Sequence, residues 1–225
     1  MSGPPVLLVH GFATSAARTW GDNGWLDLLA DAGRTTIAVD LLGHGNASKP
    51  HDAAAYGDLE ALVAAQLPDE PVDAIGFSMG ARLLLTLAAD EPGRFRKIVV
   101  SGIGANLFRS DDASSVVADA IGGRGEHTNP VAQYFAGLAQ HPESDREALM
   151  ACLRSPRPPL DDGRLERVTV PVLVALGDDD FAGPADPLVQ ALPDATFVPL
   201  RRVDHFATPK SFAFIDAALD FIGAA

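Results

Sequence analysis

The chain has 225 residues, 47% of them hydrophobic and 21% charged, and its formal net charge is -13. Such a chain can bury one substantial hydrophobic core but leaves little room for a second full domain. The acidic balance argues against nucleic acid and against an anionic membrane as partners, because the average field of the protein would repel both. A polyanionic substrate is weakly disfavoured for the same reason, although a local basic pocket could override the average field.

The cysteine content and the apolar runs exclude further classes. The only cysteine, Cys152, leaves no intramolecular disulfide and no multi-cysteine metal site possible. The first residues lead directly into the short apolar run 6–9, without the basic start and long apolar stretch of a secretory signal. No apolar run reaches the roughly eighteen residues that a membrane helix needs. We therefore expect a cytoplasmic protein with no membrane partner, and both a monomer and a homodimer are compatible with the sequence.

In chain order, short apolar runs alternate with segments of helical spacing. The runs lack polar alternation, which is typical of strands covered on both faces, and they lie at 6–9, 36–39, 72–76, 97–101, 170–176 and 195–200. Helical spacing is found from Trp25 to Ala32, in 58–67, 79–90 and 184–192, and from Phe212 to Ile222. The alternation predicts an α/β fold with a mostly parallel central sheet of about six strands, flanked by helices and joined by right-handed crossovers.

One interval breaks this alternation, because about sixty residues separate the strand ending near Ser101 from the strand beginning near Val170. We predict a core domain of residues 1–107 and 168–225 and a short helical insertion of residues 108–167. Apolar positions predict three helices in it, around Val116, Val117, Ala120 and Ile121, around Val131, Tyr134, Phe135 and Leu138, and around Leu149 and Leu153. We interpret Gly122, Gly123 and Gly125 as a flexible joint rather than a phosphate cradle, because no helix opens directly after them.

The strongest chemical motif is the segment from Gly76 to Gly80, with the sequence G-F-S-M-G, which stands between a predicted strand and a predicted helix. A serine at this place lies on a sharp turn that only small neighbours permit, and the turn lifts its hydroxyl clear of the sheet. Ser78 is therefore a candidate nucleophile. Because a serine hydroxyl is too weakly acidic to attack unaided, the hypothesis requires a histidine within reach and a carboxylate behind that histidine.

With this motif the chain resembles the α/β-hydrolase family over essentially its whole length. His10-Gly11-Phe12-Ala13 resembles the family's oxyanion loop, and the segment from Asp40 to Ser48 resembles its turn after the next strand. Leu176 to Asp180 resembles the acid loop, and Val203 to Phe206 resembles the histidine loop. The chain order of serine, aspartate and histidine is the family's order.

The resemblance implies a catalytic triad of Ser78, His205 as general base, and an acid from the run of three aspartates. The family usually places the acid three residues after the glycine that ends the strand, which selects Asp180 and leaves Asp179 as the alternative. It further implies an oxyanion hole formed by the backbone N–H groups of Phe12 and Met79. No organic cofactor and no metal is implied.

The remaining histidines have other interpretations. His10 is expected to shape the oxyanion loop and His44 to be structural. His51, His127 and His141 lie in polar, proline-flanked loops and are expected to be solvated. No histidine pair has the i, i+4 spacing of a helical metal-ligand set, which argues against a metal site.

In the family the insertion forms a lid above the nucleophile. Its stripe of Val131, Tyr134, Phe135 and Leu138 could line a substrate pocket, and packing against the sheet domain is the competing interpretation. The candidate pocket residues are His10, Gly11, Tyr134, Phe135, Leu138 and Phe206.

The expected activity is that of a carboxylesterase-like serine hydrolase, which cleaves a small to medium carboxylic ester or thioester through an acyl-enzyme. A carbon–carbon bond hydrolase, a hydroxynitrile-lyase-like enzyme and a ligand receptor with residual activity remain alternatives. Haloalkane dehalogenases and epoxide hydrolases resemble this architecture but use an aspartate nucleophile, so a serine at position 78 argues against them.

Overall fold

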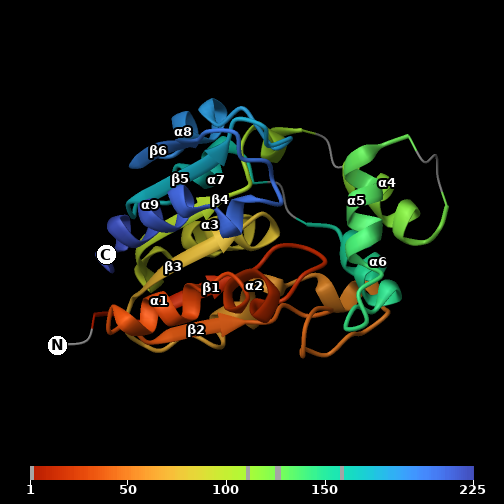
Figure 1. Cartoon of the computed structure of the whole chain (residues 1–225), viewed down its shortest axis with the longest axis horizontal. Helices are drawn as coiled ribbons and strands as arrows, with labels where there is room; N and C mark the ends of the chain where they lie inside the picture. Colours follow the sequence, from red (N-terminus) through yellow and green to blue (C-terminus); the bar gives the residue numbers. More distant parts are fainter. Residues whose placement is uncertain (1–2, 110–111, 125–127, 158–159) are drawn as a thin grey trace.

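The computed structural model describes residues 3–109, 112–124, 128–157 and 160–225 (Figure 1). In these ranges, parallel strands form one six-stranded sheet in the order β2-β1-β3-β4-β5-β6. The strands are β1 (Val6–Val9), β2 (Thr36–Val39), β3 (Val72–Phe77), β4 (Phe95–Ser101), β5 (Val172–Gly177) and β6 (Ala195–Leu200). The predicted sheet of about six mostly parallel strands is therefore confirmed, because the apolar runs without alternation are the strands of this sheet.

Helices cover both faces of the sheet, and each face has its own hydrophobic core. One face is covered by α1 (Trp25–Asp31) and α9 (Phe212–Ile222), and the other by α2 (Leu59–Ala64), α3 (Met79–Asp90), α7 (Asp162–Leu165) and α8 (Asp186–Ala191). Alternate residues of β1 enter the two cores: Val6 and Leu8 pack with α1 and α9, and Leu7 and Val9 pack with α3. The two-residue period of a strand explains this division, and it explains why every position of β1 is apolar.

Most helix limits lie close to those predicted, and α2 shows why some differ. Its start is fixed by Asp58, whose carboxylate accepts a hydrogen bond from the Ala61 amide at 3.0 Å. Beyond Ala64, the amides of Gln66 and Leu67 each bond to the carbonyl three residues earlier, which tightens the last turn. The helix is therefore shorter than the predicted range 58–67.

Between β4 and β5 lie α4 (Asp112–Ile121), α5 (Pro130–Leu138) and α6 (Arg146–Arg154), which correspond to the three predicted helices. Figure 1 shows them grouped together beside the sheet. The division into a core of residues 1–107 and 168–225 and a lid of residues 108–167 stays a prediction. Gly123 has a positive φ of 71°, a backbone conformation that glycine adopts readily, whereas Gly125 lies outside the described residues.

One histidine in a polar loop links this group of helices to the core. His51 Nε2 lies 3.0 Å from Asp145 Oδ2, and its Nδ1 lies 3.0 Å from Glu147 Oε2 at the start of α6. The hydrogen bond with Asp145 raises the pKa of His51 above its usual value. His51 is exposed, as expected of a solvated histidine, and the fold brings two carboxylates to it that the sequence did not indicate. His141 is half-exposed, so its ring is accessible to water as expected, and His127 lies outside the described residues.

The short helices complete the chain. They are the single π-helical turn η1 (Ala17–Gly21) and the 3-10 turns η2 (Ala53–Tyr56), η3 (Pro92–Arg94), η4 (Ala105–Phe108) and η5 (Thr208–Lys210). Across the described ranges, none of the helices is both long and apolar enough to span a bilayer.

Candidate active site

Ser78 occupies the sharp turn between β3 and α3. Its backbone has φ 52° and ψ -113°, a strained conformation for a residue with a side chain. A Cβ on Gly80 would lie 2.2 Å from the Val9 carbonyl oxygen, and a Cβ on Gly76 would lie 2.7 Å from Ala81 Cα. Only glycine fits at these two positions, so the motif reflects the close approach of the turn to β1 and to its own helix.

Three positions that are far apart in the sequence meet at this turn. His205 Nε2 lies 3.1 Å from Ser78 Oγ, and His205 Nδ1 lies 3.0 Å and 3.1 Å from the two carboxylate oxygens of Asp180. A carboxylate only accepts hydrogen bonds, so Nδ1 carries the ring proton and Nε2 is left as an acceptor for the serine hydroxyl. The structure thus brings together the predicted serine, histidine and acid in the order that nucleophile activation requires.

Of the three consecutive aspartates, only one faces the histidine. Asp180 is 7% exposed, and its Oδ1 also accepts a hydrogen bond from the Ala182 amide at 2.9 Å. Asp179 is exposed, and Asp178 accepts a hydrogen bond from the Arg202 amide in the histidine loop. The two loops come together at Gly177, where a Cβ would lie 1.9 Å from the Val203 carbonyl oxygen. The geometry therefore favours Asp180 over Asp179.

Aromatic rings enclose the His205 imidazole, which is 2% exposed. The ring centroids of Phe181, Phe77 and Phe206 lie 4.3 Å, 4.9 Å and 5.2 Å from it. These rings exclude water from most of the imidazole and strengthen its hydrogen bonds by lowering the local dielectric constant. Sequence reasoning did not single out Phe77 or Phe181, although both adjoin predicted site residues in the sequence.

Two backbone N–H groups beside Ser78 have no hydrogen-bond acceptor in the part of the chain that the structure describes: those of Phe12 and Met79. Met79 begins α3, where the first amides of a helix have no partner within it. The loop that carries Phe12 approaches the turn closely, since a Cβ on Gly11 would lie 3.4 Å from Ser78 Cβ. Both amides are therefore available to a negatively charged oxygen near the serine.

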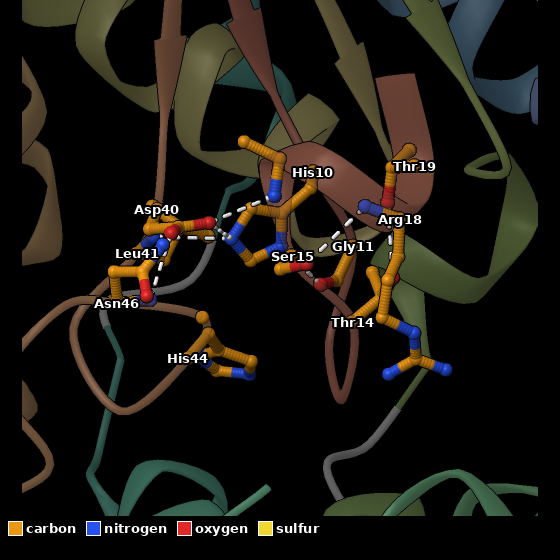
Figure 2. Close-up of polar contacts among 12 residues, drawn as sticks. His10, Gly11, Thr14, Ser15, Arg18, Thr19, Asp40, Leu41, His44 and Asn46 are labelled. Atoms are coloured by element: carbon orange, nitrogen blue, oxygen red, sulfur yellow. Dashed lines mark hydrogen bonds and ion pairs between the residues drawn. The ribbon is translucent and has the colours of Figure 1, made fainter. Parts of the chain in front are cut away.

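Asp40 and His10 hold this loop in place (Figure 2). The Asp40 carboxylate accepts hydrogen bonds from the Ala16 and Asn46 amides, both at 2.8 Å, and so joins the loop after β1 to the loop after β2. His10 Nε2 accepts a hydrogen bond from the Leu41 amide at 3.1 Å, and its Nδ1–H donates to the Gly11 carbonyl at 2.7 Å. Asp40 lies in the predicted turn motif, but nothing in that motif indicated that it connects the two loops.

His10 and His44 are both neutral in the folded protein. Burial lowers the pKa of His10 to about 4 and that of His44 to about 3. A proton on His10 Nε2 would also break its hydrogen bond with the Leu41 amide. The expected structural role of these two histidines agrees with these contacts.

These shifts predict acid sensitivity. Below about pH 6.5 the unfolded chain protonates both histidines, whereas the folded protein excludes the proton until about pH 4 or lower, so acidification favours unfolding. At pH 5 the expected loss in the free energy of unfolding is about 2 kcal/mol per histidine.

Denaturant titrations at pH 7.5 and pH 5 measure this loss. His44→Gln should make the difference between the two pH values about 2 kcal/mol smaller than in the wild type. The control His141→Gln, at a half-exposed histidine, should not. Equal pH dependence in the wild type and His44→Gln would contradict the assignment.

Ser78 and His205 line a cavity of about 110 Å3. Tyr134, Phe135 and Leu138 of α5 line it together with Phe206, and the Tyr134 ring stacks on the Phe206 ring at a centroid distance of 3.5 Å. The α5 stripe thus lines the cavity as well as packing against the histidine loop. Val131, from the same predicted stripe, lines a separate cleft instead.

Two predicted pocket residues do not line this cavity, and the expectation for His10 and Gly11 is corrected. His10 is fully buried beneath the loop, where both ring nitrogens bond to backbone, and Gly11 packs against Phe77. The lining residues that were not predicted from the sequence are Phe77 and a set of mostly polar residues, namely Thr14, Arg18, Thr19, Asn23 and Pro209. No group of three or more His, Cys, Asp or Glu within the described ranges is arranged to hold a metal ion.

A parallel α/β sheet that presents a serine on a strand–turn–helix elbow to a histidine–aspartate pair is the architecture of the α/β hydrolases. The model of the alpha/beta hydrolase fold family matches residues 4–150, and the chain belongs to this family.

Similar proteins include named hydrolases. The chain is 30% identical, over 80% of its length and 76% of the relative's, to the pimeloyl-acyl-carrier protein methyl ester esterase of Neisseria meningitidis serogroup C. It is 31% identical, over 98% of its length and 92% of the relative's, to RutD of Variovorax paradoxus, whose name assigns it provisionally as a carbamate hydrolase. Among solved structures, MenH from S. aureus has a TM-score of 0.76 at 18% identity, covering 99% of this chain and 94% of that one.

Proposed function

We propose that the protein is a serine hydrolase that cleaves small carboxylic esters or thioesters through an acyl-enzyme intermediate. The observation that carries the proposal is the hydrogen-bonded chain from Ser78 Oγ through the His205 ring to the buried Asp180 carboxylate. The esterase and hydrolase names of the two sequence relatives support an ester-like substrate.

In the proposed mechanism, His205 Nε2 accepts the proton of the Ser78 hydroxyl as Oγ attacks the substrate carbonyl carbon. Asp180 keeps the Nδ1 proton in place and stabilises the imidazolium that forms. His205 then gives the proton to the leaving alcohol or thiol, which departs and leaves an acyl group on Ser78. A water molecule, deprotonated by the same nitrogen, releases the carboxylic acid and restores the serine.

The Phe12 and Met79 amides are assigned to the oxyanion of the tetrahedral intermediates. Neither amide has another acceptor among the described residues, so neither has to break a bond in order to bind it. The positive end of the α3 helix dipole also stabilises the negative charge of the oxyanion. Donors of this kind, held ready before the reaction, typically contribute about a hundredfold or more in rate.

The size of the cavity indicates short groups beside the reacting carbonyl. A buried apolar cavity of about 150 Å3 accommodates one benzene molecule, and the cavity at Ser78 measures about 110 Å3. The aromatic wall from α5 and Phe206 suits a small apolar group, and a long acyl chain would have to extend into solvent.

The test combines covalent labelling with an ester series. The purified protein should react with a fluorophosphonate at Ser78, located by peptide mass spectrometry, and should hydrolyse nitrophenyl acetate and butyrate at least tenfold faster than the octanoate. An acetyl thioester, followed by thiol release, separates ester from thioester preference. The absence of both labelling and nitrophenol release would reject the proposed function, whereas a preference for octanoate would reject only the size argument.

A further inference from the structure

The cavity at Ser78 has a polar wall that the hydrolysis of a neutral ester does not use. Besides the aromatic residues of α5, the cavity is lined by Thr14, Arg18, Thr19 and Asn23, which form this polar wall and come from the loop after β1, from η1 and from the turn that follows η1. The wall is built from internal contacts: the Thr14 and Thr19 hydroxyls lie 3.1 Å apart, and Asn23 Nδ2 donates to the Thr19 carbonyl at 2.9 Å. The position of Arg18 is thereby fixed on a short, anchored turn.

Arg18 is a positively charged residue in the lining of this cavity. Within the described ranges, no Asp or Glu oxygen lies within ion-pair distance of its guanidinium. Its Nη1 donates to the Ala13 carbonyl at 3.3 Å, which leaves most of the five N–H donors available. Glu143 lines a very small neighbouring cavity with Arg18 but does not pair with it.

The carboxylate of Asp40, which anchors the same loop, is committed elsewhere. Both carboxylate oxygens of Asp40 accept hydrogen bonds from backbone amides. Figure 2 shows the Arg18 side chain on the side of the loop away from Asp40. In a protein with a net charge of -13, an arginine in the lining of the cavity that holds Ser78 is a local exception to the average field.

We propose that Arg18 forms a carboxylate-binding subsite and that the substrate is an ester of a short dicarboxylic acid, cleaved at one end while its free carboxylate binds Arg18. This inference rests on the proposed function. A guanidinium binds a carboxylate through two parallel N–H donors, and the partly enclosed cavity strengthens such a contact. One negative charge matches one arginine, whereas a polyanion would meet the repulsion of the whole protein.

The subsite is assigned to the acyl half of the substrate. His205 must reach the leaving-group oxygen, which places the leaving group beside His205 and the neighbouring Phe206. Arg18 belongs instead to the loop segment that continues from Phe12, whose amide is assigned to the carbonyl oxygen. The carboxylate therefore lies at the far end of the acyl chain, and the alcohol is small.

The experiment compares two esters that differ only in charge: monomethyl glutarate and its neutral amide analogue, methyl 4-carbamoylbutanoate, with methanol release as the readout. The wild type should favour the anionic ester in kcat/KM by roughly tenfold to a hundredfold, as expected for a charged hydrogen-bonded pair. The difference should lie mainly in KM. Monomethyl succinate and monomethyl adipate, each compared with its neutral amide analogue, define the preferred spacing between the ester carbonyl and the free carboxylate of the substrate.

Substitutions assign this preference to one side chain. Arg18→Gln should reduce the ratio of the two kcat/KM values to near one. Arg18→Lys should keep part of the wild-type preference, because lysine supplies a positive point charge without the two parallel donors of a guanidinium. The control Arg201→Gln removes an equal charge from an exposed position and should keep the wild-type ratio. Arg18→Glu should favour the cationic methyl 5-aminopentanoate, a gain that a misfolded protein cannot show.

The outcomes separate the subsite from the proposed function. If the wild type hydrolyses nitrophenyl acetate and labels at Ser78 but does not distinguish the two glutarate esters, the subsite is rejected and the hydrolase remains. Retention of the wild-type ratio in Arg18→Gln, or no reversal in Arg18→Glu, also rejects it. Only one outcome counts against the proposed function itself: a wild-type protein that neither labels at Ser78 nor hydrolyses a neutral ester.

Discussion

Ser78→Ala should lower kcat for nitrophenyl acetate by roughly a millionfold and abolish fluorophosphonate labelling, because serine, histidine and acid act as one unit in such sites. The substitution removes the nucleophilic oxygen that lies 3.1 Å from His205 Nε2. It leaves the elbow intact, because alanine keeps the Cβ that the strained backbone at this position already carries. Stopped assays in which the product is detected by chromatography can measure both the wild-type rate and the much lower rate of the variant.

Ser101→Ala is the matched control for this substitution. Ser101 is buried on the neighbouring strand β4, and its hydroxyl donates to the Gly76 carbonyl at 3.3 Å rather than facing the cavity. This variant should keep most of the activity and label normally. If Ser78→Ala retained more than a hundredth of the wild-type rate, the acyl-enzyme mechanism would be wrong.

The fold could be predicted from the sequence because its dominant patterns are local. Central strands covered on both faces need continuous apolar runs, and the run at 6–9 gives the limits of β1 directly. The run at 195–200 gives the limits of β6, although this strand lies at the edge of the sheet and is largely exposed. The serine turn was similarly visible, because Gly76 and Gly80 are dictated by close contacts that a Cβ would obstruct. At the end of α2, short-range hydrogen bonds determine where the helix stops, and the apolar pattern therefore overestimated its length.

The parts of the site that could not be predicted depend on contacts between distant segments. Arg18 follows the oxyanion-loop motif in a stretch with no distinctive pattern, and only the fold places it in the cavity with Ser78. His51 gains two carboxylates from the N-cap and the first turn of α6, almost a hundred residues away. His10 adjoins the loop in sequence but is turned inward by its bond to the Leu41 amide, so proximity in sequence suggested the wrong surroundings.

Asp180→Asn tests the remaining part of the proposed triad, and it should lower kcat by about ten-thousandfold. An amide nitrogen in place of the carboxylate oxygen can donate to His205 Nδ1, which moves the ring proton to Nε2. In that tautomer Nε2 can no longer accept the proton of the Ser78 hydroxyl, although the ring keeps its position. The defect should appear in kcat with little change in KM, because neither Asp180 oxygen lines the substrate cavity.

The neighbouring Asp179→Asn is the matched control, since it makes the same chemical change one residue earlier in the chain. Asp179 is exposed, whereas the Asp180 carboxylate is fully enclosed and holds both His205 and the Ala182 amide. Asp179→Asn should therefore stay within about threefold of the wild type. Equal losses in the two variants would mean that the acidic loop acts through its overall charge, and a larger loss in Asp179→Asn would transfer the role of the acid to that residue.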